Sequence, residues 1–233
     1  NLFDGTPTYN DLLQYDAVVF FKHWSSGVTT ALQNALIAYA NDGGGVVALH
    51  HAVYNEPEGA LNKDILIDQL FGVESGPGVD VSNAALQNYH LFSVNYGHFV
   101  STYGVDLAGD NPGLSAPGSW SGNSPSTSGN LSYSYYQNFG IYDEIYDNIT
   151  FTPGQSFGRG VNQITPLFSN DVNGYADPVS HASGFVKLFN PSGDGSVGRV
   201  VFFQPGERRE SVTINHRYGQ VIRNAVVWAA QAN

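Results

Sequence analysis

The sequence predicts an α/β fold with a mainly parallel sheet. Short β-branched and aromatic runs alternate with stretches of helical periodicity in the N-terminal part of the chain. These runs are apolar at successive positions, which is typical of strands covered by helices on both faces. Strands that alternate with helices join through right-handed crossovers and pair in parallel. Because 42% of the 233 residues are hydrophobic, the chain can form one sizeable core. We therefore expect a single domain over residues 1–233.

The clearest elements lie at the start of the chain. Residues 16–21, DAVVFF, have the composition of a buried strand, and residues 25–42 repeat apolar side chains at helical spacing until Gly43. A second strand is expected over residues 45–49, and a second amphipathic helix over residues 61–71. This order is the basis of the α/β prediction.

The rest of the chain contains a long insertion between further elements. Residues 89–95 are a candidate strand, and residues 110–138 are rich in Gly, Ser and Tyr. Loops of this length are uncommon unless they are functional or flexible, and the aromatic residues argue against simple flexibility. Residues 198–204, GRVVFFQ, predict another strand, and residues 216–232 predict a closing helix.

Composition narrows the classes of partner. The net charge is -11 with only 9 Lys and Arg residues, so nucleic acid is not an expected partner. Only 12% of residues are charged, which suits an extracellular protein that binds neutral, hydroxyl-rich ligands or packs against its own copies. No apolar run approaches the roughly 18 residues of a membrane span, so membrane insertion is not expected. Since the chain has no cysteine, any metal must bind His, Asp or Glu.

Histidines follow two of the expected strands. His50 and His51 come directly after residues 45–49, and His23 with Trp24 comes after residues 16–21. Ligands bind outside the carboxyl ends of parallel strands, so these positions are candidate site positions. Successive side chains leaving a strand point to opposite sides, so one of the paired histidines should face a site and the other pack, unless the chain turns sharply. Alternatively, both are hydrogen-bonded structural residues under a loop.

Five motifs in order resemble the trehalose-utilisation, ThuA-like family. They are YDAVVFF, LQNALIAYANDGGGVVALHHA, YDEIYD, GRVVFF and VIRNAVVWAA. The resemblance implies the class I glutamine-amidotransferase-like fold, a flavodoxin-like three-layer α/β/α sandwich. It also places His50 at the turn where amidotransferases carry their nucleophilic cysteine. Imidazole cannot form the thioester of glutamine hydrolysis, so amidotransferase activity is excluded.

The resemblance also implies a site of histidines and a carboxylate. His98 in GHFVS resembles the first residue of the family's HPIT motif, and Asp143 with Glu144 resembles its DE pair. His50, His98 and Glu144 are therefore the expected catalytic residues, and the same three are the expected ligands of a divalent metal. The expected substrate-binding residues surround them: His23, Trp24, Tyr142, Tyr146 and Glu207. A neutral sugar, stacked on tyrosine, is the substrate class that the family implies.

Three features depart from the family pattern. Glu207 occupies the position where the family has histidine after the GRVVFF strand, and His181 lies near an expected tryptophan. The family's first strand also has no counterpart in residues 1–15. A strand buried in a sheet must pair on both sides, so we expect another copy, or part of the insertion, to supply the missing neighbour.

Two functions are consistent with these observations. The first is a secreted ThuA-like domain that binds, and transforms, a neutral carbohydrate through a His and carboxylate site, with a divalent metal as the one candidate cofactor. The second is a non-catalytic extracellular module, or a self-assembling structural subunit, that retains the fold. Convergence of His50, His98 and Glu144 in one cleft would favour the enzyme.

Overall fold

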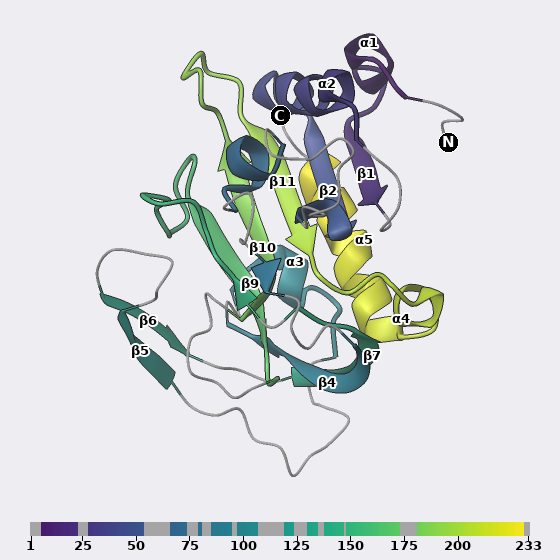
Figure 1. Cartoon of the computed structure of the whole chain (residues 1–233), viewed down its shortest axis with the longest axis vertical. Helices are drawn as coiled ribbons and strands as arrows, with labels where there is room; N and C mark the ends of the chain where they lie inside the picture. Colours follow the sequence, from purple (N-terminus) through teal and green to yellow (C-terminus); the bar gives the residue numbers. More distant parts are fainter. Residues whose placement is uncertain are drawn as a thin grey trace.

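The computed structural model describes residues 6–22, 28–53, 66–73, 79–80, 85–94, 97–106, 119–123, 130–134, 138–146, 148–172 and 181–230. Its centre is a seven-stranded mixed sheet in the order β1 (Ala17–Lys22), β2 (Gly45–His50), β11 (Gly198–Phe203), β10 (Ala182–Phe189), β9 (Ile164–Asn170), β4 (Leu86–Ser93) and β7 (Asn138–Glu144) (Figure 1). Two small sheets accompany it, made by β3 (Val79–Asp80) with β8 (Asn148–Ile149) and by β5 (Ser119–Asn123) with β6 (Asn130–Ser134).

Helical segments connect and cover the sheet. They are α1 (Tyr9–Leu12), α2 (Thr30–Asn41), α3 (Phe99–Thr102), α4 (Arg209–Thr213), α5 (His216–Ala230), the 3₁₀ turn η1 (His51–Val53) and the π-helical turn η2 (Leu66–Phe71). None of the helices in the described part of the chain is long and apolar enough to cross a membrane.

The predicted α/β class is confirmed, but the prediction of a mainly parallel sheet is wrong. Only the pairs β1 with β2 and β2 with β11 are parallel, whereas the four pairs from β11 to β7 are antiparallel. The reason lies in the connections. β9, β10 and β11 follow one another in the chain as neighbours in the sheet, and short connections between neighbouring strands permit only antiparallel pairing.

The parallel part of the sheet is covered by helices on both faces. Val46 of β2 packs in one core cluster with Leu36 of α2, whereas Val47 packs in a second cluster with Val221 of α5. Alternate side chains of a strand point to opposite faces, so β2 buries every one of its residues. The carboxyl end of β2, at His50, is therefore buried between the layers that cover the sheet.

Several elements differ in extent from their predictions. α2 begins at Thr30, because the Thr29 hydroxyl caps it by accepting the Leu32 backbone N–H at 3.2 Å. Within the predicted helix 61–71, η2 covers Leu66–Phe71, and residues 61–65 lie outside the described residues. The insertion 110–138 contains the antiparallel pair β5 and β6, and its other residues before Asn138 lie outside the described residues.

Candidate functional site

The site begins with a sharp turn at the end of β2. His50 has φ 56°, in the left-handed region that side chains other than glycine rarely adopt. Such a conformation costs about 1–3 kcal/mol and persists only where the surrounding structure enforces it. Gly206 makes room for this turn, since a Cβ at that position would lie 2.9 Å from the His50 Cβ. The turn leads directly into η1, which begins at His51.

Because of this turn, both paired histidines lie in one cluster. His50 Nε2 lies 3.2 Å from Glu144 Oε2 and 3.2 Å from Glu207 Oε2. His51 Nε2 lies 3.6 Å from the same Glu144 oxygen. The ring of Tyr146 stacks beside both imidazoles, with centroid distances of 5.7 and 5.8 Å. Ligand atoms of His50, His51 and Glu144 all lie within 4.8 Å of one another, as a metal ion would require.

The backbone fixes how His50 uses its two nitrogens. Its Nδ1 lies 3.0 Å from the Gln204 carbonyl oxygen, which can only accept a hydrogen bond. Nδ1 therefore carries hydrogen, and in the neutral ring Nε2 presents its lone pair to the two carboxylates. Burial pushes the pKa of His50 down, but the Glu144 and Gln204 contacts and the charge of Asp143 outweigh this effect and raise the pKa above its ordinary value. A proton or a cation at Nε2 is thus favoured.

Asp143 holds the two carboxylate residues in place. Its buried side chain accepts the Glu144 backbone N–H at 2.8 Å and the Glu207 backbone N–H at 3.0 Å through Oδ1. Its Oδ2 accepts the Arg208 backbone N–H at 3.4 Å. Burial raises the pKa of Asp143 despite these hydrogen bonds. One buried carboxyl group therefore ties the end of β7 to the segment that follows β11.

The residues predicted to bind substrate lie in different surroundings. Glu207 joins the cluster directly, whereas Tyr146 is buried and contacts the imidazoles rather than the surface. Its predicted role in stacking on a sugar is therefore wrong. Tyr142 is 46% exposed, two positions before Glu144, and its ring lies under the Arg208 guanidinium at 5.9 Å. His23 and Trp24 lie outside the described residues.

The predicted grouping of His98 with His50 and Glu144 is wrong. His98 Nδ1 accepts the Val100 backbone N–H at 3.2 Å and so caps α3. Its ring packs edge-on against Trp228, with a centroid distance of 5.3 Å. The Trp228 carbonyl accepts a hydrogen bond from Arg199, next to Gly198 at the start of β11. His98 therefore lies by the end of β11 that is opposite to Gln204 and the cluster, where GHFVS serves as a helix start.

Burial of His98 predicts a pH dependence of stability. Burial, together with the charges of Arg159 and Arg199, lowers the pKa of His98 from 6.5 to about 4. Between these values the unfolded chain binds a proton that the native state does not, so stability should fall as the pH falls from 6.5 toward 4. Asparagine can also cap a helix. We expect His98→Asn to lose part of this pH dependence in thermal unfolding, and an equal dependence in both proteins would contradict the assignment.

Two residues of the cluster were not identified as members from the sequence pattern. The alternation of side chains along a strand predicts that His51 packs away from a site used by His50. The left-handed φ of His50 reverses this, and no sequence pattern reveals that torsion. Asp143 is implied only by the family's DE pair, and two of its three backbone hydrogen bonds come from the segment after β11. The one sequence feature that could have indicated both imidazoles in one site is the adjacent pair of histidines directly after an apolar strand.

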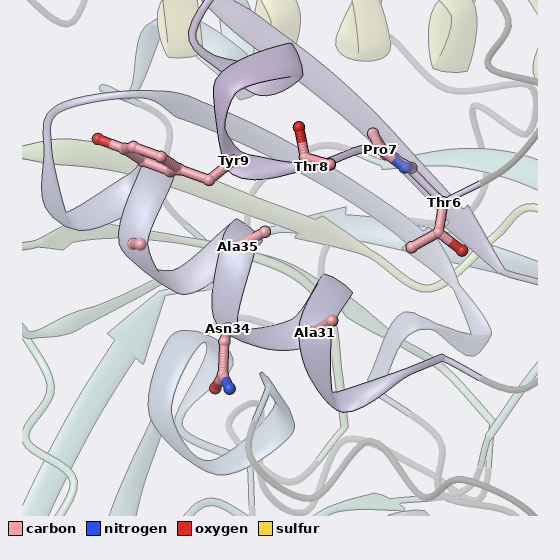
Figure 2. Close-up of a pocket in the computed structure, with 8 residues that line it drawn as sticks. Thr6, Pro7, Thr8, Tyr9, Ala31, Asn34 and Ala35 are labelled. Carbon is pink, nitrogen blue, oxygen red and sulfur yellow. The ribbon is translucent and has the colours of Figure 1, made fainter.

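A separate groove lies between α1 and α2, remote from these residues in the chain. It has a volume of about 480 Å³ and is lined on one side by residues 6–9 and on the other by Ala31, Asn34, Ala35 and Ala38 (Figure 2). The Tyr9 hydroxyl donates a hydrogen bond to Asp42. The residues that line the groove offer hydroxyl groups and one amide, but no imidazole or carboxylate. The groove is therefore not part of the cluster of His50, His51, Glu144 and Glu207.

Comparison with solved structures identifies the fold. A protein named as ThuA-like from Bacteroides uniformis matches 95% of this chain and 72% of its own, at 15% identity and a TM-score of 0.54. A protein with the same description from Parabacteroides merdae matches 96% of this chain and 73% of its own, at 16% identity and a TM-score of 0.54. The chain has the fold of these ThuA-like proteins. No family model and no curated protein matches the sequence.

Proposed function

We propose that this chain is a secreted ThuA-like protein that binds a divalent cation through His50, His51, Glu144 and Glu207 and acts there on a neutral carbohydrate. One observation carries the proposal: Nε2 of His50 lies 3.2 Å from each of two carboxylate oxygens. Two imidazoles with one or two carboxylates suit Zn²⁺ and similar transition metals. The hydrogen bond from His50 Nδ1 to a backbone carbonyl is the usual support of a metal-binding histidine.

Three of the separations between donor atoms are close to those around a small tetrahedral ion. Bonds of about 2.0–2.2 Å in a tetrahedron place neighbouring ligand atoms about 3.3–3.6 Å apart. The three separations from the two imidazoles to the carboxylates are 3.2, 3.2 and 3.6 Å. Bound Zn²⁺ would polarise a substrate oxygen or activate water. In this arrangement Glu144 and Glu207 are ligands or proton acceptors, and Asp143 orients both.

Surface chemistry supports a neutral carbohydrate. The net charge of -11 disfavours polyanionic ligands, and few residues are charged. Tyr142 is an exposed aromatic residue two positions before Glu144, and aromatic faces suit the apolar faces of pyranose rings. The side chains of Glu144 and Glu207 are partly exposed, whereas the Oε2 atoms that face His50 are buried.

Calorimetric titration of the metal-stripped protein with Zn²⁺ and Mn²⁺ tests the metal site. We expect one ion per chain, and Glu144→Gln should weaken binding by about 10–100-fold because an amide is a poorer ligand than a carboxylate. Glu210→Gln is the matched control, since Glu210 is exposed and paired with Arg208 at 3.6 Å. Equal affinity of wild type and Glu144→Gln would overturn the site. A panel of neutral sugars, titrated with and without the metal, then tests the substrate class.

A non-catalytic role is the second candidate, favoured by the burial of His50. Its side chain has no exposed surface, and the two carboxylates beside it come from β7 and from the segment after β11. A protonated His50 would join these segments as a structural ion pair. In that case Glu144→Gln should lower the stability of the metal-free protein while no divalent ion binds the wild type. These outcomes distinguish the two candidates.

A further inference from the structure

We propose that two copies of this chain associate by antiparallel pairing of the free edges of their β1 strands. β1 is the terminal strand of the seven-stranded sheet and pairs only with β2 (Figure 1). Within the described ranges, no strand lies against its other edge. The proposal concerns this edge and is independent of the metal site.

The hydrogen-bond register shows which backbone groups point outward. The Gly45 N–H donates to the Asp16 carbonyl, and Ala17 lies opposite Gly45 in the parallel register. In a parallel pair, the N–H and C=O of one residue point to the same side, and those of the next residue point to the other side. Residues 16, 18 and 20 therefore bond to β2. Ala17, Val19 and Phe21 direct their N–H and C=O groups away from the sheet.

The same edge exposes large apolar side chains. Val19 is 53% exposed and Phe21 is 49% exposed, whereas Val18 and Phe20 pack against the core. Natural edge strands are normally protected by charges, proline, bulges or a covering segment. Residues 17–21, AVVFF, contain no charge and no proline, and their register with β2 is regular. Among the described residues, this strand therefore combines outward backbone groups that no other strand pairs with apolar surface.

A second copy fits this edge because the edge is self-complementary. In a two-fold antiparallel pair centred on Val19, Val19 faces its own copy and Ala17 faces Phe21. All three outward residues then form hydrogen-bonded pairs, which exchange about six N–H···O bonds in total. The outward backbone edge of one strand meets the same edge of the other, as an isologous interface requires. Asp16 lies opposite position 22, a lysine in the sequence, so the ends carry opposite formal charges.

Sedimentation velocity over a concentration series tests the association. We expect a reversible dimer, and Val19→Lys should weaken it by about tenfold or more because it places like charges across the two-fold axis. Val19→Pro should do the same, since it removes an outward N–H without affecting the bonds to β2. Ile214→Lys is the matched control, because Ile214 is 73% exposed at the end of α4. A monomeric wild type at every concentration, or a dimer unchanged in Val19→Lys and Val19→Pro, would overturn the proposal.

A cysteine cross-link tests the register itself. The chain has no cysteine, so Val19→Cys introduces a single thiol. Facing residues of a hydrogen-bonded antiparallel pair have Cα atoms about 5.5 Å apart, within the range of a disulfide. We expect mild oxidation to convert Val19→Cys into a covalent dimer, and Ile214→Cys to remain largely monomeric. Equal cross-linking of the two variants would contradict the β1 interface.

Discussion

Replacing Lys187 with methionine is expected to raise the free energy of unfolding at pH 7 by about 2–3 kcal/mol. Lys187 lies on β10 between Phe185 and Phe189 on the same face, both in the core, and it is 4% exposed. Its Nζ lies 3.4 Å from the Gln69 carbonyl and 5.5 Å from the Phe189 ring centroid. Burial lowers the pKa of Lys187 from 10.5 to about 8, which corresponds to a cost of about 3 kcal/mol for the charged form. Methionine has a similar shape without the charge.

The pH profile provides the control for this prediction. Between about pH 8 and pH 10.5 the unfolded chain holds more protons than the native state, so wild-type stability should rise with pH. Lys187→Met lacks this contribution, so its advantage should be full below pH 8 and should vanish toward pH 10.5. Chemical denaturation at pH 7, 8.5 and 10 measures both curves. A variant that is less stable than the wild type at pH 7 would show that the contacts of the ammonium outweigh its desolvation.

Asp143→Asn is expected to damage both stability and metal affinity. An asparagine side chain has one acceptor oxygen and an amide nitrogen, so it loses at least one of the three backbone N–H bonds that Asp143 accepts. A buried N–H left unsatisfied costs about 1–3 kcal/mol. Since Asp143 positions Glu144 and Glu207, Zn²⁺ affinity should fall by about 10–100-fold, as for other residues that support metal ligands.

The control separates positioning from general destabilisation. Asp194 accepts the Ser196 backbone N–H in an exposed turn, so Asp194→Asn makes the same chemical change away from the cluster. Denaturation and Zn²⁺ titration of both variants, at a temperature where both are folded, give the two readouts. If Asp143→Asn loses stability but keeps wild-type affinity, Asp143 is structural and does not orient the carboxylates.

The location of the site could be predicted from sequence, but its composition only in part. Gly43 to Leu49 marks a helix end followed by a buried strand, so His50 was correctly placed at a strand terminus. His51 depends on the unusual φ of His50, which no periodicity reveals. His98 carries no mark that distinguishes a helix cap from a ligand, because imidazole nitrogen serves both purposes.

The antiparallel half of the sheet was missed for a related reason. β9 and β10 contain polar residues at buried positions, such as Ser169, Ser183 and Lys187, which weaken the apolar pattern of a strand. The Ser183 hydroxyl donates to Gln204, just after β11, and accepts from Asn170 of β9, so its polarity is satisfied by residues distant in the chain. Local sequence does not indicate such partners.

The mixed sheet also implies an order of events in folding. β9, β10 and β11 pair with their neighbours in the chain, so their loops close at low entropic cost. β2 must instead find β11 across most of the polypeptide, and the contact between His50 and Gln204 spans 154 positions. Contacts of such long range form late. The cluster of His50, Glu144 and Glu207 is therefore assembled when the two halves of the sheet dock, which makes its completion a reporter of the final folding step.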